Sequence, residues 1–182
     1  MPPTRHDRLS VVATALRLLD EVGLPDLSMR RLATELDVQP SALYWHFASK
    51  QELLAAVADS ILRTVPEPDA RTPLPEVARS IRDALLACRD GAEVVLSTYA
   101  LRLGARRAQD ALLLALDGED QPAADALFEF ILGHTMLLQQ RMHAQSIGAT
   151  ASDDADPTPD AEAVFTAGVN GFAELSARRR PS

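Results

Sequence analysis

The sequence predicts an all-α protein in two parts, an N-terminal three-helix unit and a longer C-terminal helical domain. Apolar residues recur at spacings of three and four along most of the 182 residues, which is the period of an amphipathic helix. No segment alternates convincingly between apolar and polar residues, so no β-strand is expected. Four prolines between positions 66 and 75 cannot continue a helix. They separate an N-terminal domain at 5–65 from a C-terminal domain at 75–182.

The first two helices follow from apolar spacing and capping residues. A helix over 9–22 is expected to stop at Gly23, and its apolar face comprises Leu9, Val12, Leu16, Leu19 and Val22. Ser28 can cap a second, short helix over 29–36, because its hydroxyl can accept a hydrogen bond from a free N–H in the first turn. The inward-facing residues of this second helix are Leu32, Ala33 and Leu36.

A third, short helix is predicted over 40–47, because Pro40 suits a first helical turn. Ser49 and Glu52 form a capping box for a fourth helix, which extends to Leu62 and connects the two domains. Two short helices joined by a turn of three or four residues and packed on a longer helix form a helix-turn-helix. The second short helix of this motif lies in the DNA major groove. The pattern therefore indicates a protein that binds double-stranded DNA.

Five further helical segments are predicted beyond the prolines, over 75–89, 93–103, 105–117, 122–147 and 160–179. Glycines and the polar stretch 148–159 separate them, and this stretch is expected to be a mobile loop. We expect the last two segments to form the dimer interface. The last segment carries a stripe at helical spacing, made up of Val164, Phe165, Gly168, Val169, Phe172 and Leu175.

Composition and charge narrow the class of protein. The net charge of −8 lies wholly in residues 51–182, which hold 12 Lys or Arg and 20 Asp or Glu, whereas residues 1–50 hold six of each. The single cysteine, Cys88, excludes an intrachain disulfide and a zinc site built from cysteines. It is expected to be a small buried apolar group, with a redox role left open. No apolar run is long enough to cross a bilayer and no signal sequence is visible, so no membrane partner and a cytoplasmic location are expected.

Enzyme motifs are absent from the sequence: there is no glycine-rich phosphate loop, no His-Glu-x-x-His and no Gly-x-Ser-x-Gly. His134 and His143 lie nine residues apart and cannot share a metal on one helix. We therefore expect a protein that is not an enzyme and that uses no cofactor and no metal.

The helix-turn-helix region resembles the DNA-binding domain of the TetR family. The resemblance rests on Leu-Ser-Met-Arg-Arg-Leu-Ala at 27–33, Val-Gln-Pro-Ser-Ala-Leu-Tyr-Trp-His-Phe at 38–47 and Ser-Lys-Gln-Glu-Leu-Leu at 49–54. More weakly, Leu-Leu-Ala-Cys-Arg-Asp-Gly-Ala-Glu-Val at 85–94 and Gly-His-Thr at 133–135 resemble the regulatory domain of the tetracycline-repressor class. The resemblance implies a homodimer that binds an operator and responds to a small-molecule effector.

For the DNA contacts, the resemblance and side-chain chemistry together predict Met29, Arg30, Gln39, Pro40, Ser41, Ala42, Tyr44, Trp45, His46 and Lys50. Arg30 and Gln39 can make bidentate contacts with base edges. Tyr44 and Lys50 are the main candidates for phosphate contacts, which fix the register of the protein on DNA without reading its sequence. Trp45 either supports the DNA face or belongs to the core. His46 either contacts phosphate or is an ordinary surface residue, and Phe47 is expected to pack inward.

The predicted effector site departs from the tetracycline-repressor class, which binds a magnesium–drug chelate. Val95 and Met142 occupy the positions of an imidazole and a carboxylate, and Val77 replaces an amide. Valine and methionine cannot hold magnesium, which requires oxygen ligands. A more apolar, metal-independent effector is therefore expected, in a pocket within the C-terminal domain lined by Val77, Ile81, Val95, Thr98, Tyr99, His134 and Leu138. For His134, a hydrogen-bonded core histidine is the alternative.

The most favoured function is that of a homodimeric repressor released from a palindromic operator by a small molecule. An activator of transcription remains open, as does a helical small-molecule-binding module without DNA. The sequence does not identify the effector, the operator or the regulated genes.

Overall fold

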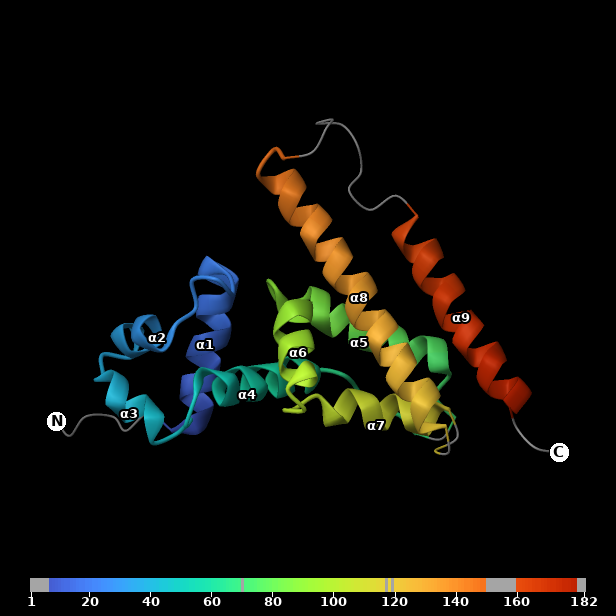
Figure 1. The fold of residues 1–182 in the computed structure, drawn as a ribbon, viewed down its shortest axis with the longest axis horizontal. Helices are drawn as coiled ribbons and strands as arrows, with labels where there is room; N and C mark the ends of the chain where they lie inside the picture. Colours follow the sequence, from blue (N-terminus) through green and yellow to red (C-terminus); the bar gives the residue numbers. More distant parts are fainter. Residues whose placement is uncertain (1–6, 70, 117, 119, 150–159, 180–182) are drawn as a thin grey trace.

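The structure, a computed structural model, describes residues 7–69, 71–116, 118, 120–149 and 160–179, without the side chains of 177 and 179. This part of the chain is helical and contains no β-strand, which confirms the predicted all-α fold (Figure 1). The helices are α1 (Arg8–Val22), α2 (Met29–Glu35), α3 (Pro40–Tyr44), α4 (Lys50–Leu62), α5 (Leu74–Leu86), α6 (Gly91–Ala100), α7 (Arg106–Ala115), α8 (Gln121–Ser146) and α9 (Ala161–Arg179). Most of the predicted loop at 148–159 lies outside the described residues.

Helix α1 buries a face that differs from the predicted one. Val11, Ala15 and Leu18 are buried together with Val12 and Leu19, whereas Leu9 is 68% exposed. At 100° per residue, Leu9 lies about 200° from Val11 around the helix axis, so the two side chains cannot share a face. The prediction that Leu9 belongs to the inward stripe is therefore wrong. Gly23 ends the helix as expected, with φ of +80°.

The predicted caps of the N-terminal unit are present. The Ser28 hydroxyl accepts a hydrogen bond from Arg31 N at 3.2 Å, and the Ser49 hydroxyl accepts one from Glu52 N at 3.2 Å. The Glu52 carboxylate in turn accepts from Ala48 N, one residue before the cap. Each such cap contributes about 1 kcal/mol. Helix α3 is shorter than predicted, because the backbone turns after Tyr44 and the N–H groups of His46 and Phe47 both donate to Leu43 O.

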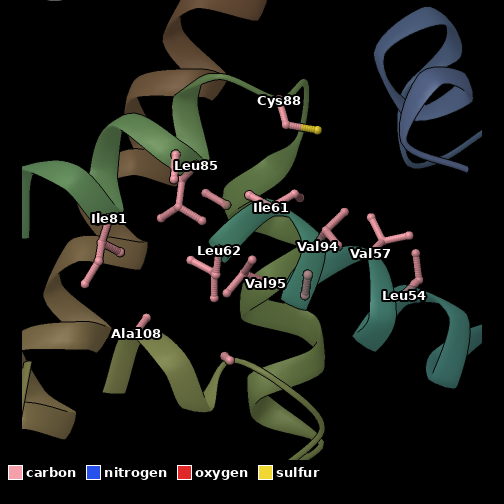
Figure 2. Close-up of a cluster of buried hydrophobic side chains, with 14 of the residues drawn as sticks. Leu54, Val57, Ile61, Leu62, Ile81, Leu85, Cys88, Val94, Val95 and Ala108 are labelled. Atoms are coloured by element: carbon pink, nitrogen blue, oxygen red, sulfur yellow. The ribbon is translucent and has the colours of Figure 1, made fainter. Parts of the chain in front are cut away.

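Helix α4 belongs to the apolar core of both halves of the chain. It packs against α1 on one side and against α5, α6 and α7 on the other. Figure 2 shows Val57, Ile61 and Leu62 of α4 among side chains of α5, α6 and α7. Helix α4 thus packs against helices from both halves of the chain, and one buried cluster runs through it without a break. The division into domains at 5–65 and 75–182 stays a prediction.

Helix α9 packs against α5 and α8 within the same chain. The Arg82 guanidinium of α5 lies 4.4 Å from the centroid of the Phe165 ring and forms an ion pair with Glu162. The Phe130 ring of α8 stacks on Phe165 with centroids 6.1 Å apart. Gly168 faces Phe130, so closely that an added Cβ would lie 2.2 Å from the end of the ring.

Of the stripe predicted for the dimer interface, one part is therefore buried within the chain and the other part is exposed. Phe165 and Val169 are buried within the chain, where α5 and α8 cover them, and Gly168 provides the close approach to α8 rather than to a second subunit. Val164 and Leu175, from the same stripe, remain more than half exposed.

None of the helices in the described part of the chain is both long and apolar enough to cross a membrane.

His134 of α8 lies in the same aromatic cluster. Its ring centroid is 5.2 Å from that of Phe165 and 5.9 Å from that of Phe130, and its Nε2 is buried without a hydrogen-bond partner. Burial lowers the pKa of His134, and the positive charges of Arg82 and Arg141 lower it further, whereas the carboxylate of Glu162 opposes this shift. The imidazole thus packs as a neutral group, and no hydrogen bond satisfies its Nε2.

The close approach at Gly168 gives a matched pair of substitutions. We expect Gly168→Ala to lower the free energy of unfolding by about 1–3 kcal/mol, because Phe130 is held by its ring neighbours and cannot easily yield. Gly171→Ala, one turn later in open space, should leave stability unchanged or raise it by up to about 1 kcal/mol through helix propensity. Urea unfolding followed by circular dichroism measures both, and equal effects would contradict this packing.

The buried imidazole predicts a pH dependence of stability. The unfolded chain protonates His134 near its ordinary pKa of 6.5, whereas the folded chain does so only at lower pH. The unfolded state therefore binds more protons in this window, and the contribution of His134, complete above pH 6.5, is lost as the pH falls through the folded pKa. Urea titrations between pH 5 and 7.5 should show a shallower dependence for His134→Gln than for the wild type. His143→Gln, at an exposed position of α8, should retain the wild-type dependence.

Candidate functional site

The two short helices form a rigid helix-turn-helix. Leu32 of α2 and Leu43 of α3 are buried, and Val38 in the turn packs against them as predicted. The turn closes through Asp37, whose φ of +52° is left-handed, and through a 3.0 Å hydrogen bond from Val38 N to Ala33 O. Phe47 is fully buried after α3, which confirms its predicted inward position. The core thus fixes the outer face of α3.

Most of the residues predicted to contact DNA are exposed or half-exposed, and they lie in α2, in α3 and directly before and after it, and at the start of α4. Trp45 is 89% exposed and Tyr44 is 53% exposed, an unusual position for two large aromatic rings unless they serve recognition. The exposed group also includes Arg30, Gln39 and Ser41, and the half-exposed group comprises Pro40, Ala42, His46 and Lys50. For Trp45 the core alternative is therefore wrong.

Met29 departs from the predicted set. It is the first residue of α2, and its side chain is only 8% exposed and belongs to the apolar core. The Ser28 cap fixes the start of the helix, and this register turns the Met29 side chain inward. A contact between this side chain and DNA is not compatible with that burial, so the prediction for Met29 is wrong.

Arg8 is a residue that sequence reasoning missed. Its guanidinium donates a hydrogen bond to the carbonyl of His46 and lies 4.1 Å from the centroid of the Phe47 ring. The start of α1 is thereby joined to the turn that follows α3. Only the position of an arginine at the first turn of the first helix could have suggested this role, because the contact spans 38 residues.

The residues predicted to line an effector pocket are separated by the structure. Ile81, Val95 and Thr98 expose 1% of their surface or less, which leaves no water-sized space beside them. The Thr98 hydroxyl is satisfied within its own helix by the carbonyls of Val94 and Val95. Val77 and Leu138 are also buried, and Val95 lies within the packed cluster of Figure 2. The prediction of an open pocket lined by these residues is therefore wrong for this conformation, because their own side chains fill it.

Tyr99 and His134 lie apart from that core. Tyr99 packs edge-on against Phe128, with ring centroids 5.2 Å apart, and burial raises its pKa. Its other side lines a polar hollow at the start of α7, together with Arg102 and Arg106. His134 belongs to the aromatic cluster beneath α9. His134 therefore fits neither the pocket-lining role nor the hydrogen-bonded core histidine that the sequence suggested. It packs among aromatic rings, and its Nε2 has no hydrogen-bond partner.

The turn between α5 and α6 forms hydrogen bonds with the end of α1, a contact that the sequence did not predict. The Asp90 carboxylate accepts a hydrogen bond from Leu24 N at 2.8 Å. Arg89 N donates to the carboxylate of Asp20 at 2.9 Å, and the Arg89 guanidinium donates to Glu21 O at 3.2 Å. Gly23 leaves the necessary room, because an added Cβ would lie 3.0 Å from the Asp90 carboxylate.

The same turn is held from the other side by Gln139 of α8. Its side-chain oxygen accepts from Ala92 N at 3.1 Å, and its nitrogen donates to Leu85 O at 3.1 Å and Cys88 O at 2.8 Å. One side chain thus forms hydrogen bonds with three backbone groups of the turn. Through this turn, α8 is connected to α1 and to the helix-turn-helix.

Cys88 lies in this turn with 7% of its surface exposed. Burial raises the pKa of its thiol to about 12, and the carboxylates of Asp20 and Asp90 act in the same direction. A thiol so difficult to ionise is a poor nucleophile and a poor redox sensor. The structure therefore favours the small buried apolar group over the redox role.

Comparisons with known proteins agree with this architecture. Residues 11–57 match the family model for bacterial regulatory proteins of the tetR family. The chain is 45% identical over 102 residues to the tetracycline repressor protein class G of Vibrio anguillarum, an alignment that covers 52% of this chain and 49% of that protein. The chain thus matches about half the length of this curated relative. This family is one of regulatory proteins and the relative is a repressor protein, and neither is an enzyme.

Solved structures match nearly the whole chain. BioQ of Mycobacterium smegmatis is 39% identical, with a TM-score of 0.80 over 93% of this chain and 98% of that one. A structure of BioQ with its natural double-stranded DNA operator is 37% identical, with a TM-score of 0.76 over 92% and 98% of the two chains. A variant of TetR from Acinetobacter baumannii AYE in complex with minocycline is 32% identical, with a TM-score of 0.71 over 97% and 99%. The helix-turn-helix, the family match and these full-length similarities together show that this chain belongs to the TetR family of bacterial regulatory proteins.

Proposed function

We propose that the chain is a homodimeric transcriptional repressor that binds a palindromic operator and is released from it by a small molecule. The observation that carries this proposal is the exposure of Tyr44 and Trp45, at the end of α3 and directly after it, on a tightly packed helix-turn-helix. The similarity to BioQ, which has been solved with its operator DNA, supports DNA as the partner. The acidic charge of the chain lies outside residues 1–50 and does not oppose this contact.

Different side chains of the N-terminal unit serve different parts of the DNA. Arg30 and Gln39 are exposed and have the donor and acceptor geometry that base edges require. Tyr44 and Lys50 contact phosphates, which orient the protein on the duplex. The short side chains of Ser41 and Ala42 let the backbone of α3 approach the groove.

Dimerisation uses the outer faces of α8 and α9. Leu137 of α8 and Val164 and Leu175 of α9 are large apolar side chains that are more than half exposed. Apolar side chains gathered on two long helices are typical of a protein interface. Figure 1 shows the two helices side by side, away from α3, so a second copy can pair there while both copies present α3 to DNA.

Footprinting on the DNA upstream of its own gene tests the proposal. A dimer with one reading helix per subunit should protect one palindromic block, with half-site centres about 34–36 Å apart or a little more. Sedimentation of the complex should give two chains per block. Stable binding of a single half-site by a monomer would exclude this arrangement, and failure to bind any upstream DNA would exclude the function.

Lys50 gives a test of the phosphate contacts. We expect Lys50→Ala to weaken binding to all DNA sequences about equally and to reduce the slope of log K against log salt by about one. Arg63→Ala, at the opposite end of α4, is the matched control and should leave the slope unchanged. Gln39→Ala should instead relax preference at particular base pairs, by about 1–3 kcal/mol. Titrations at several salt concentrations on operator and random duplexes distinguish these outcomes.

The effector is a small molecule that binds without a metal ion. A complex of a TetR variant with minocycline supports a small-molecule ligand for this architecture. In this chain Val95 is buried among apolar side chains and Met142 lies exposed on α8, so neither position offers an oxygen or nitrogen ligand. Among the described residues, no group of three or more His, Cys, Asp or Glu side chains is placed to hold a metal.

Tetracycline is the probe for this part of the proposal. We expect tetracycline with magnesium to leave the operator complex intact in a gel-shift assay, and EDTA to have no effect. The tetracycline repressor protein class G, assayed on its own operator, is the positive control. Release that requires both tetracycline and magnesium would show that other side chains of this chain supply the metal ligands.

A further inference from the structure

A small cavity of about 250 Å³ lies between the α5–α6 turn and the C-terminal half of α8. Leu86 at the end of α5 lines it together with Cys88, Arg89 and Asp90 of the turn, and α8 contributes Gln139, Met142, His143 and Ser146. This cavity is separate from the filled core around Ile81 and Val95. Two of its lining residues, Arg89 and Asp90, form hydrogen bonds with the end of α1.

Asp90 is the acidic group of this cavity, and its carboxylate can accept a further hydrogen bond. One carboxylate oxygen, Oδ2, accepts the hydrogen bond from Leu24 N at 2.8 Å. For the other oxygen, no hydrogen bond is found among the described residues. The side chain is half-buried, so its charge is less screened by water than that of an exposed group. It can therefore attract a cationic N–H donor into the cavity.

The surrounding charges favour a cation over an anion. The carboxylates of Asp20 and Asp90 both act on the Cys88 thiol in the cavity wall, and both raise its pKa. The one positive side chain of the turn, Arg89, is exposed to solvent and already donates to Glu21 O. An organic anion would thus be attracted only weakly by Arg89, whose charge is screened by water, and would be repelled by the carboxylates of Asp20 and Asp90.

Apart from Asp90, Arg89 and His143, the side chains that line the cavity are apolar or neutral. Leu86 of α5 and the half-exposed Met142 of α8 face the cavity, and a thioether adapts its shape to different apolar ligands. We propose that this cavity binds a small organic ammonium ion with an apolar body, with its nitrogen at the free oxygen of Asp90 and its body against Leu86 and Met142. The volume suits a ligand smaller than a typical drug molecule.

The regulatory consequence rests on the function proposed above. A cation bound at the free oxygen of Asp90 draws the carboxylate toward the cavity and away from Leu24 N, which donates to the other oxygen, and so weakens the contact between the turn and the end of α1. Since α1 carries the helix-turn-helix, occupancy of the cavity lowers the affinity for operator DNA. A ligand acts in this way only by binding more tightly to the conformation that does not bind DNA.

A matched series of probes tests the cavity without DNA. In ¹⁵N NMR titrations of the full chain, 4-phenylbutylamine should shift the side-chain amide of Gln139 and the backbone amide of Leu24, and 4-phenylbutanol should bind at least tenfold more weakly. 4-Phenylbutyrate should not shift these signals. Tighter binding of the butyrate than of the amine, or amine shifts confined to other regions, would overturn the proposal.

Asp90→Asn removes the charge but keeps an acceptor for Leu24 N, and asparagine tolerates the left-handed φ of +54° at this position. This variant should lose amine binding by tenfold or more, whereas Asp110→Asn on α7 should bind as the wild type does. Loss in both variants, or in neither, would contradict a site at Asp90.

A gel-shift arm tests the regulation. Saturating amine should weaken operator binding by about fivefold or more in the wild type and leave Asp90→Asn unaffected. Amine binding that leaves operator affinity unchanged would overturn the regulatory role. A wild-type chain that binds no operator DNA would instead overturn the function proposed in the preceding subsection, while the NMR titration tests the cavity on its own.

Discussion

The hydrogen bonds between the α5–α6 turn and the end of α1 fix the position of the N-terminal helices relative to the C-terminal helices. The turn has a shape that few sequences could adopt, since an added Cβ at Gly91 would lie 2.4 Å from Leu85 O. Gln139 stabilises this shape through hydrogen bonds with Ala92 N and Leu85 O and through a further one to Cys88 O, which also accepts from Gly91 N. A polar backbone group left without a partner when buried would cost about 1–3 kcal/mol. The outer side of the turn is then free to present Arg89 and Asp90 to α1.

A second attachment runs through α4. Its apolar side chains lie in one cluster with those of α1, α5, α6 and α7, and its Asp59 carboxylate accepts a hydrogen bond from Ala105 N at the start of α7. The helix-turn-helix is thus fixed to the C-terminal helices at two points, an apolar one along α4 and a polar one at the end of α1. The apolar contact is non-directional, whereas the polar contact depends on hydrogen-bond geometry. A shift of either attachment would change where α3 points, and the proposed function requires such a link between ligand binding and DNA binding.

The success of prediction from the sequence depended on how local the signal was. The caps at Ser28 and Ser49, the turn before Pro40 and the inward Phe47 each depend on neighbouring residues, and the structure has all of them. Apolar spacing identified helices but not what covers each face of a helix, which explains the errors at Leu9 and along the α9 stripe. The error at Met29 has another origin, because the resemblance does not show which way a side chain points. Filling of the core around Ile81 and Val95 is a property of many side chains together. The contacts of Gln139 and Arg8 span 38 to 54 residues, and no local pattern encodes them.

The exposure of Trp45 has a spectroscopic consequence. It is the only tryptophan of the chain, and its indole is already in water in the folded state. Its emission should therefore change little when the protein unfolds, and a denaturation curve recorded from tryptophan fluorescence would miss the transition. The same emission reports the surroundings of the turn after α3 without background from the core. Trp45 is therefore a fluorescent reporter at the surface that we propose binds DNA.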